Sequence, residues 1–263
     1  MNEIRVIKDI CYDPPKELLL DLYLPEVTGP LPVFVFFHGG GFEDYRQKEM
    51  GEPLSRYLAS QGILCVNPAY RHYPKARFPD FIEDGAAAVA WVKNHIQEYA
   101  DAGSIFIGGH SAGGHLSMLH CFDEHYLGVH GLNSKTDIAG YLFISGQPTT
   151  HMNVLKEDDT DSRAVLIDER APLYHVRGND GPPLLITCTD NDIQNRLEQT
   201  DLLVGTLKHF DYQSPVEYHV IQGFGHNNCL LPDEKHPHMP SPCASLIHQF
   251  IEKYKDAKAD LSK

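Results

Sequence analysis

The chain has 263 residues, of which 42% are hydrophobic and 22% are charged, a composition that one globular domain commonly has. Its formal net charge at pH 7 is −14. This charge argues against a nucleic-acid partner, which needs clustered Lys and Arg, and against docking on an anionic membrane surface.

The start of the chain and its cysteines indicate a cytoplasmic protein. Residues 1–5 lack the basic-then-apolar pattern of a signal peptide. No apolar run approaches the roughly 20 residues that span a bilayer. The six cysteines are scattered without a C-x-x-C pair, so we expect free, buried thiols.

The N-terminal part of the chain reads as strands. Residues 4–12 and 16–24 alternate polar and apolar side chains, which predicts two antiparallel strands joined at Asp13-Pro14-Pro15. Residues 33–37 are apolar throughout. A strand that is apolar on both faces belongs in the middle of a sheet covered by helices on both sides.

Strands and helices then alternate. We expect further strands at 63–66, 105–107, 138–144, 184–187 and 216–221, and helices at 81–99, 112–122, 194–210 and 244–254. This order predicts one α/β domain over residues 1–263, with a mostly parallel sheet. Functional residues of such a sheet lie at the carboxyl ends of its strands.

Residues 146–171 break this alternation, because they are polar and acidic and lack a strand-like run. They form either a solvated surface excursion or a lid over a pocket. By their positions relative to strand ends, Phe42 and Gln147 are candidates to contact a substrate.

Gly109-His110-Ser111-Ala112-Gly113 matches the G-x-S-x-G pattern of a nucleophile elbow. In this turn the serine joins a strand to a helix, and the positions two before and two after it are crowded against neighbouring backbone. The pattern stands between an expected strand and an expected helix. We therefore predict that Ser111 is a nucleophile.

Three consecutive glycines, Gly39 to Gly41, follow the most hydrophobic strand. Because glycine is costly to order, something there needs a bare backbone. We expect Gly40 and Gly41, together with Ala112, to donate N–H groups to an oxyanion. A phosphate loop would need G-x-x-x-x-G-K-[ST] or G-x-G-x-x-G, and neither is present. We expect His38 to brace the loop through a hydrogen bond.

Position selects the base among 16 histidines. His226 lies in the Gly-rich loop after the last strand, where the chain order Ser, Asp or Glu, His places it. His110 and His115 lie in the elbow itself, and His219 lies inside a strand.

The acid should follow the preceding strand, and both Asp190 and Asp192 do so. One of them would hold the imidazole in the correct tautomer. The other would cap the turn or the next helix.

His236-Pro237-His238 might suggest a metal, but no carboxylate or cysteine cluster accompanies it at ligand spacing. We expect loop surface there, and neither a metal nor an organic cofactor in the protein.

With these motifs in place, the chain resembles the esterase/lipase branch of the α/β hydrolases. It is nearest to small bacterial esterases, which include carbohydrate-ester and feruloyl-ester-like members and kynurenine formamidases. The resemblance covers about residues 18–254 and is carried by four groups of residues: His38-Gly39-Gly40-Gly41-Phe42; Tyr70-Arg71 with Phe78-Pro79 and Glu83-Asp84; Gly109 to Leu116; and Gly225-His226.

The resemblance implies an α/β-hydrolase fold with a small cap or none. It also favours Asp192 as the acid, because the family's G-D-x-D pattern aligns with Thr189-Asp190-Asn191-Asp192, although Thr189 replaces the glycine. It implies a serine hydrolase that cleaves small-molecule, short-chain acyl esters. Two alternatives remain: an amidase or formamidase with the same residues, and a hydrolase-like binding protein that has lost catalysis.

Overall fold

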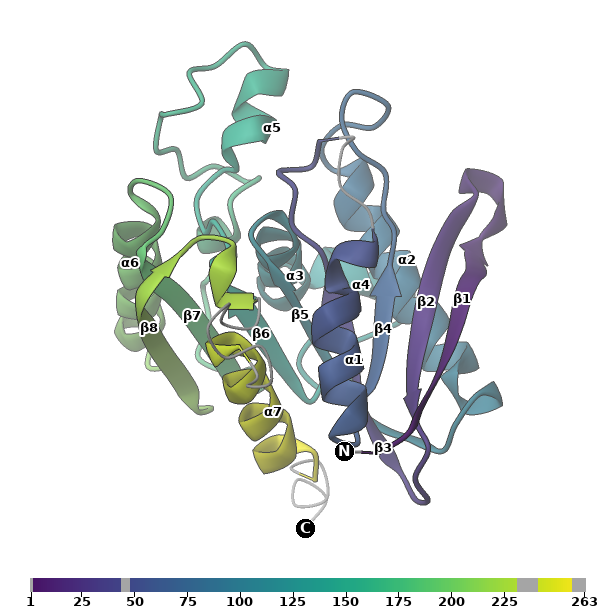
Figure 1. Cartoon of the computed structure of the whole chain (residues 1–263). Helices are drawn as coiled ribbons and strands as arrows, with labels where there is room; N and C mark the ends of the chain where they lie inside the picture. The colour runs from purple at the N-terminus through teal and green to yellow at the C-terminus, as the bar shows by residue number, and fades with distance from the viewer. Residues whose placement is uncertain (1, 44–47, 231–240, 257–263) are drawn as a thin grey trace.

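An eight-stranded sheet crosses the centre of the computed structural model, which describes residues 2–43, 48–230 and 241–256 (Figure 1). Its spatial order is β1-β2-β4-β3-β5-β6-β7-β8. Strands β3 to β8 are parallel, whereas β1 and β2 run antiparallel at one edge, which confirms the mostly parallel sheet. The strands are β1 (Ile4–Asp13), β2 (Leu18–Pro25), β3 (Leu31–Phe37), β4 (Leu64–Pro68), β5 (Ala102–His110), β6 (Gly140–Ile144), β7 (Leu184–Asn191) and β8 (Val216–Gly225).

Helices cover both faces of the sheet, as the alternation predicted. Helices α1 (Glu52–Ser60) and α7 (Pro242–Tyr254) pack on one face, in front in Figure 1. The other face carries α2 (Asp80–His95), α3 (Ala112–Phe122), α4 (Glu124–Gly128) and α6 (Arg196–His209). Short 3₁₀ turns lie at Pro14–Lys16, Lys48–Gly51, Ile96–Glu98, Pro172–His175 and Asn228–Leu230. None of the described helices has both the length and the apolarity to cross a bilayer.

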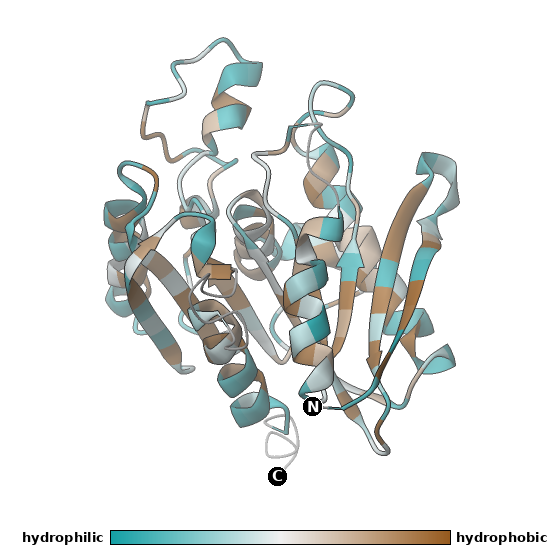
Figure 2. Ribbon diagram, viewed as in Figure 1, coloured by the Kyte–Doolittle hydropathy of each residue, from teal (hydrophilic) through white to brown (hydrophobic). Residues whose placement is uncertain are grey.

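Strand β3 explains how the core is built. All seven of its residues are buried, and it lies between β4 and β5 with an apolar layer on each side. Figure 2 shows the hydrophobic colour concentrated on the strands and on helix surfaces that face them, while the loops at the sheet's upper end are mostly hydrophilic. The polar ends of the strands are therefore the part of the fold that can carry chemistry.

Several elements differ from the sequence prediction. Strands β7 and β8 run to Asn191 and Gly225, four residues beyond the predicted ends, because backbone pairing continues through polar and glycine residues of low strand propensity. Helix α1 was not predicted. It places Leu54, Leu58 and Ala59 on its buried side and has a proline in its first turn.

Residues 146–171 contain one further helix, α5 (Met152–Glu157), which the sequence prediction also lacked. Val154 and Leu155 of α5 are buried. In Figure 1 the segment lies above the carboxyl ends of the parallel strands. It therefore stands beside the edge of the sheet at which the candidate residues gather.

Candidate active site

Ser111 lies on the turn between β5 and α3, with φ 57° and ψ −114°. Such a conformation costs a non-glycine residue about 1–3 kcal/mol. Steric crowding explains why the positions two before and two after Ser111 are glycines. A Cβ on Gly113 would lie 2.0 Å from the carbonyl oxygen of Phe37, and one on Gly109 would lie 2.4 Å from the backbone of Gly113.

Ser111, His226 and Asp192 form one hydrogen-bonded chain. The Ser111 Oγ lies 2.8 Å from His226 Nε2, and His226 Nδ1 lies 2.5 Å from Asp192 Oδ1. Because an ionised carboxylate can only accept, Nδ1 carries the proton and Nε2 accepts from the serine hydroxyl. The side chains of Asp192 and His226 are only 1% and 13% exposed.

Asp192 is held by more than the histidine. Its Oδ1 also accepts from the N–H of Ile193 at 2.7 Å, and its Oδ2 accepts from the hydroxyl of Thr189 at 3.1 Å. Burial by itself would raise the pKa of Asp192, but the hydrogen bond and the charge of His226 outweigh it and lower that pKa below its ordinary value. Asp192 therefore stays ionised at neutral pH.

The sequence reasoning missed Thr189 as a partner of the acid. This residue occupies the position at which the related pattern has glycine, and it is fully buried. Its departure from the pattern was the available signal, since a hydroxyl in place of glycine brings a donor within reach of the carboxylate.

Asp190 does not reach the histidine. Its Oδ1 accepts from the backbone N–H of Gly223 at 2.8 Å, and the residue is exposed. It therefore ties β7 to the end of β8. The sequence predicted that it would cap the turn or the next helix, and the helix cap is not found, since α6 has Asn195 as its N-cap residue, without a side-chain cap.

Gly40, Gly41 and Ala112, the predicted N–H donors, belong to the loop after β3 and to the start of α3. Gly40 and Gly41 border the same cavity as Ser111, with φ 121° and 67°. Ala112 is the first residue of α3, so its N–H has no acceptor within the helix. Neither glycine N–H donates to any residue that the structure describes. Asn153 holds the loop by donating from Nδ2 to the carbonyl of Gly41 at 2.7 Å.

The other histidines near the elbow have structural partners. His110 bonds through Nε2 to the carbonyl of His226 at 2.7 Å, and His115 bonds through Nδ1 to the carbonyl of Gln147 at 2.7 Å. Burial lowers the pKa of His110 to about 3 and that of His115 to about 4, so both are neutral. His38 bonds the carbonyl of Gly39 through Nδ1 at 2.6 Å and stacks on Tyr70. His219 lies half-buried within β8.

One cavity of about 310 Å³ opens onto the serine. Most of its wall is polar, and residues of the 146–171 segment form part of it. The lining residues are Gly40, Gly41, Glu43, Met50, Ser111, His151, Met152, Asn153, Lys156, Ile193, Arg196, His226 and Asn227.

The two candidate substrate contacts lie elsewhere. Phe42 does not line this cavity: its side chain is 1% exposed and stacks on Phe81, with ring centroids 4.1 Å apart. This corrects the expectation from position, because an aromatic ring gains more by packing in the core. Gln147 lines a second cavity that adjoins the first.

No group of three or more His, Cys, Asp or Glu side chains that could hold a metal occurs among the described residues. His236-Pro237-His238 lies outside the described residues.

Comparisons with known proteins agree with this architecture. The BD-FAE family model matches residues 20–207. "Probable carboxylic ester hydrolase LipM" of Mycobacterium tuberculosis is 30% identical over 247 residues, which cover 86% of this chain and 55% of the relative. "Esterase LipC" of the same organism is 26% identical over 254 residues, which cover 90% and 62%. This chain thus spans little more than half the length of these two relatives.

Solved structures share the fold. Esterase B from Lactobacillus rhamnosis, inhibited by a tributyrin phosphonate, aligns with a TM-score of 0.75 at 19% identity, covering 98% of this chain and 87% of that one. A truncated carbohydrate esterase from gut microbiota aligns with a TM-score of 0.75 at 18% identity, covering 95% and 96%. The fold is therefore that of the α/β hydrolases, as the motifs implied.

Proposed function

The chain belongs to the BD-FAE family, and from this premise we propose that it is a serine hydrolase that cleaves carboxylic acyl esters. One observation supports the proposal most strongly: Ser111, His226 and Asp192 are joined by hydrogen bonds of 2.8 and 2.5 Å, and the serine opens onto a cavity. The relatives named as ester hydrolases point to the same chemistry.

In the proposed reaction Ser111 is the nucleophile. Its Oγ bonds to the ester carbonyl carbon while His226 Nε2 accepts the hydroxyl proton. Asp192 stabilises the imidazolium that forms, without becoming protonated. The tetrahedral intermediate then expels the alcohol, which takes the proton from His226, and the acyl group stays on the serine.

Water completes the cycle. It gives a proton to His226 Nε2 as its oxygen attacks the acyl carbonyl, and the collapse of the second intermediate returns that proton to Ser111. In both halves of the cycle we propose that the N–H groups of Gly40, Gly41 and Ala112 donate hydrogen bonds to the negative oxygen of the tetrahedral intermediate. Fixed donors of this kind are typically worth about 10²–10³ in rate each.

We propose short-chain acyl groups because the cavity at Ser111 is only about 310 Å³. The tributyrin phosphonate complex of the esterase B neighbour supports the same size class. Esters are proposed over amides because the relatives are named as esterases. A catalytically inactive binding protein is disfavoured, because all three members of the hydrogen-bonded chain are present.

We propose that residues 1–263 act as one catalytic domain, in which 146–171 forms a wall of the pocket. His151, Met152, Asn153 and Lys156 of this segment line the cavity, and Asn153 also bonds the Gly41 carbonyl. The proposed compartment is the cytoplasm, since all six cysteines are free.

Hydrolysis of 4-nitrophenyl acetate by the wild-type protein and by Ser111→Ala tests the proposal. Removing a nucleophilic serine typically costs about 10⁴–10⁶ in kcat. A loss of only a few-fold would contradict the assignment. Comparing an acetyl ester with a formyl-kynurenine-type amide separates an esterase from a formamidase.

A further inference from the structure

Arg196 is a buried cation that no carboxylate contacts directly, and the negative charge of Asp192 acts on it only from beyond ion-pair distance. It is 2% exposed, and among the described residues no carboxylate lies within ion-pair distance of its guanidinium. Its partners are neutral: Nη1 donates to the carbonyl of Ser145, and Nη2 donates to Oε1 of Gln147 at 3.2 Å. A guanidinium has five N–H donors, so these two bonds leave most of its donor capacity unused.

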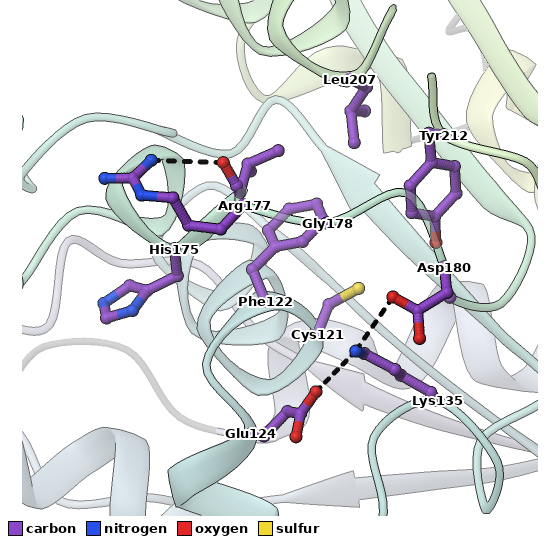
Figure 3. Close-up of a pocket in the computed structure, with 12 residues that line it drawn as sticks. Cys121, Phe122, Glu124, Lys135, His175, Arg177, Gly178, Asp180, Leu207 and Tyr212 are labelled. Carbon is purple, nitrogen blue, oxygen red and sulfur yellow. Dashed lines mark hydrogen bonds and ion pairs between the residues drawn. The ribbon is translucent and has the colours of Figure 1, made fainter. Parts of the chain in front are cut away.

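Two lysines of this protein, in contrast, have carboxylate partners. Lys48, the only other Lys or Arg that is buried among the described residues, has Asp9, Asp21 and Glu49 within 3.2 Å. In a cavity away from Ser111, shown in Figure 3, Lys135 is paired with Glu124 and Asp180. A buried charge is costly unless it is paired. Lys48 and Lys135 have carboxylates in direct contact with their ammonium groups, and Arg196 has no such contact among the described residues.

Arg196 lies where a bound ligand could supply the missing anionic partner. It lines the cavity at Ser111 and also a second cavity of about 320 Å³. Met152 and Ile193 line both cavities too, so the two spaces adjoin along these three residues. A carboxylate in the second cavity would therefore lie next to Arg196 and close to the cavity of the serine.

The lining of the second cavity suits an anion. Its described lining residues include Arg196 and neither Asp nor Glu, while the second arginine of the lining, Arg163, is already paired with Asp161 at 2.7 Å. Amide side chains supply further hydrogen-bond donors; they belong to Gln194, Asn195 and Gln199, whereas the amide N–H groups of Gln147 already donate to Thr149 and Thr150.

The described residues that line the cavity at Ser111 add no net charge apart from Arg196 itself. There the cation Lys156 is balanced by Glu43, 3.6 Å away. A chain with a net charge of −14 thus keeps one arginine without a direct carboxylate contact, Arg196, beside its serine. Walls of one sign concentrate ligands of the opposite sign.

We propose that this second cavity binds a carboxylate of the substrate, with Arg196 as its ion-pair partner, and that the preferred esters carry such a group. The inference rests on the proposed esterase function. The carboxylate belongs either to the acyl part or to the leaving alcohol of the ester, and both place the same chemistry beside Arg196. Planar, bidentate recognition of carboxylates is what a guanidinium does best.

Two matched substrate pairs test the inference. For the acyl side, the monoanion of 4-nitrophenyl adipate is compared with its neutral methyl ester. For the alcohol side, 4-acetoxybenzoate is compared with methyl 4-acetoxybenzoate. The measured quantity is the kcat/KM of the anionic ester divided by that of the neutral one, for wild type, Arg196→Lys and Arg196→Met.

In one of the two pairs we expect wild type to prefer the anion. Arg196→Met should lower the ratio about 10- to 100-fold, mainly through KM, the range expected for a hydrogen bond to a charged group. Arg196→Lys should lose less. Because Arg196 also bonds Ser145 and Gln147, its replacement affects both esters, and the ratio removes any loss of rate that the two esters share.

Arg177→Met is the matched control. Arg177 lines the cavity of Figure 3, so this substitution removes the same charge at a distance and should leave the ratio unchanged. An equal ratio in wild type and Arg196→Met for both pairs would overturn the inference. So would a wild-type preference for the neutral ester in both pairs.

If wild type hydrolyses no ester, the proposed function fails, and calorimetric titration with adipate tests the carboxylate site by itself. Binding that Arg196→Met weakens at least 10-fold supports the site. Absence of binding to wild type overturns it. If Arg196→Met does not fold, wild type and Arg196→Lys are compared in the same way: equal ratios and equal adipate affinities overturn the inference.

Discussion

Asn191 and Gly225 face each other as paired residues of β7 and β8, and the chain leaves them directly into Asp192 and His226. Neighbouring strands lie only about 4.8 Å apart. The register of the last two parallel strands therefore sets the distance between the backbones of the acid and the base, independently of their side-chain rotamers. The predictions below depend on this arrangement.

Substitution of the two aspartates at the end of β7, Asp190 and Asp192, should have very different effects on kcat. We expect Asp192→Asn to lower kcat by about 10⁴, because the amide cannot hold the same histidine tautomer. Asp190→Asn is the matched control, since that carboxylate only accepts from Gly223 and Asn191 in an exposed position. Its kcat should stay within about threefold. Equal losses in the two variants would show that Asp192 has no special role.

Thr189 should act through the acid. Thr189→Val keeps the shape of the buried side chain but removes the hydroxyl that bonds Asp192 Oδ2. We expect a fall in kcat of about tenfold, the effect of losing one hydrogen bond to a charged group, with little change in KM. Thr189→Ser should retain most of the rate. A change in KM alone would argue against positioning of the acid.

Two glycine-to-alanine substitutions should change stability in opposite directions. In Gly113→Ala the new Cβ would meet the Phe37 carbonyl at 2.0 Å, so we expect a lowered melting temperature or no folded protein. In Gly205→Ala, inside α6, the Cβ meets nothing within 4 Å. This second change should stabilise the fold by about 0.5–1 kcal/mol, through the lower helix propensity of glycine. Thermal unfolding checks both, and equal melting temperatures would contradict the steric account of the elbow.

Acid should destabilise the fold through its buried histidines. Burial lowers the pKa of His110 to about 3 and the pKa values of His115 and His120 to about 4. Below pH 6.5 these histidines bind protons in the unfolded chain but stay neutral in the folded protein. The free energy of unfolding therefore falls as the pH falls. From pH 6.5 to pH 5 each should cost about 2 kcal/mol.

Urea unfolding at the two pH values measures this loss. His120→Gln is the informative variant, because His120 contacts the carbonyl of Ile82 and lies outside the catalytic cavity. Its free energy of unfolding should lose about 2 kcal/mol less than that of wild type over the same interval. An identical pH dependence would mean that His120 binds its proton as readily in the folded protein as in the unfolded chain, which would contradict the lowered pKa.

Sequence reasoning predicted the features that follow from local sterics and alternation. The glycines around Ser111 and the uniformly apolar strand leave few alternative structures. Chain order placed His226, and either Asp190 or Asp192, at neighbouring strand ends, and the resemblance to the esterases favoured Asp192. Their catalytic roles remain predictions. Phe42 was placed wrongly, because position along the chain says where a residue is but not which way its side chain turns.

Contacts between distant segments were the part that could not be read in advance. The bond of His110 to the His226 carbonyl joins residues 116 positions apart. Arg196 meets Gln147 across 49 positions, and nothing near it in sequence marks it as buried. Such contacts depend on the packing of α6 and the 146–171 segment over the sheet.

The most direct test of the central claim is labelling with a fluorophosphonate, followed by mass mapping of the peptide that carries the adduct. We predict one adduct per chain, on Ser111, formed far more slowly in His226→Ala and absent in Ser111→Ala. Labelling that persists at another residue in Ser111→Ala, or a wild-type protein that does not react, would contradict the account.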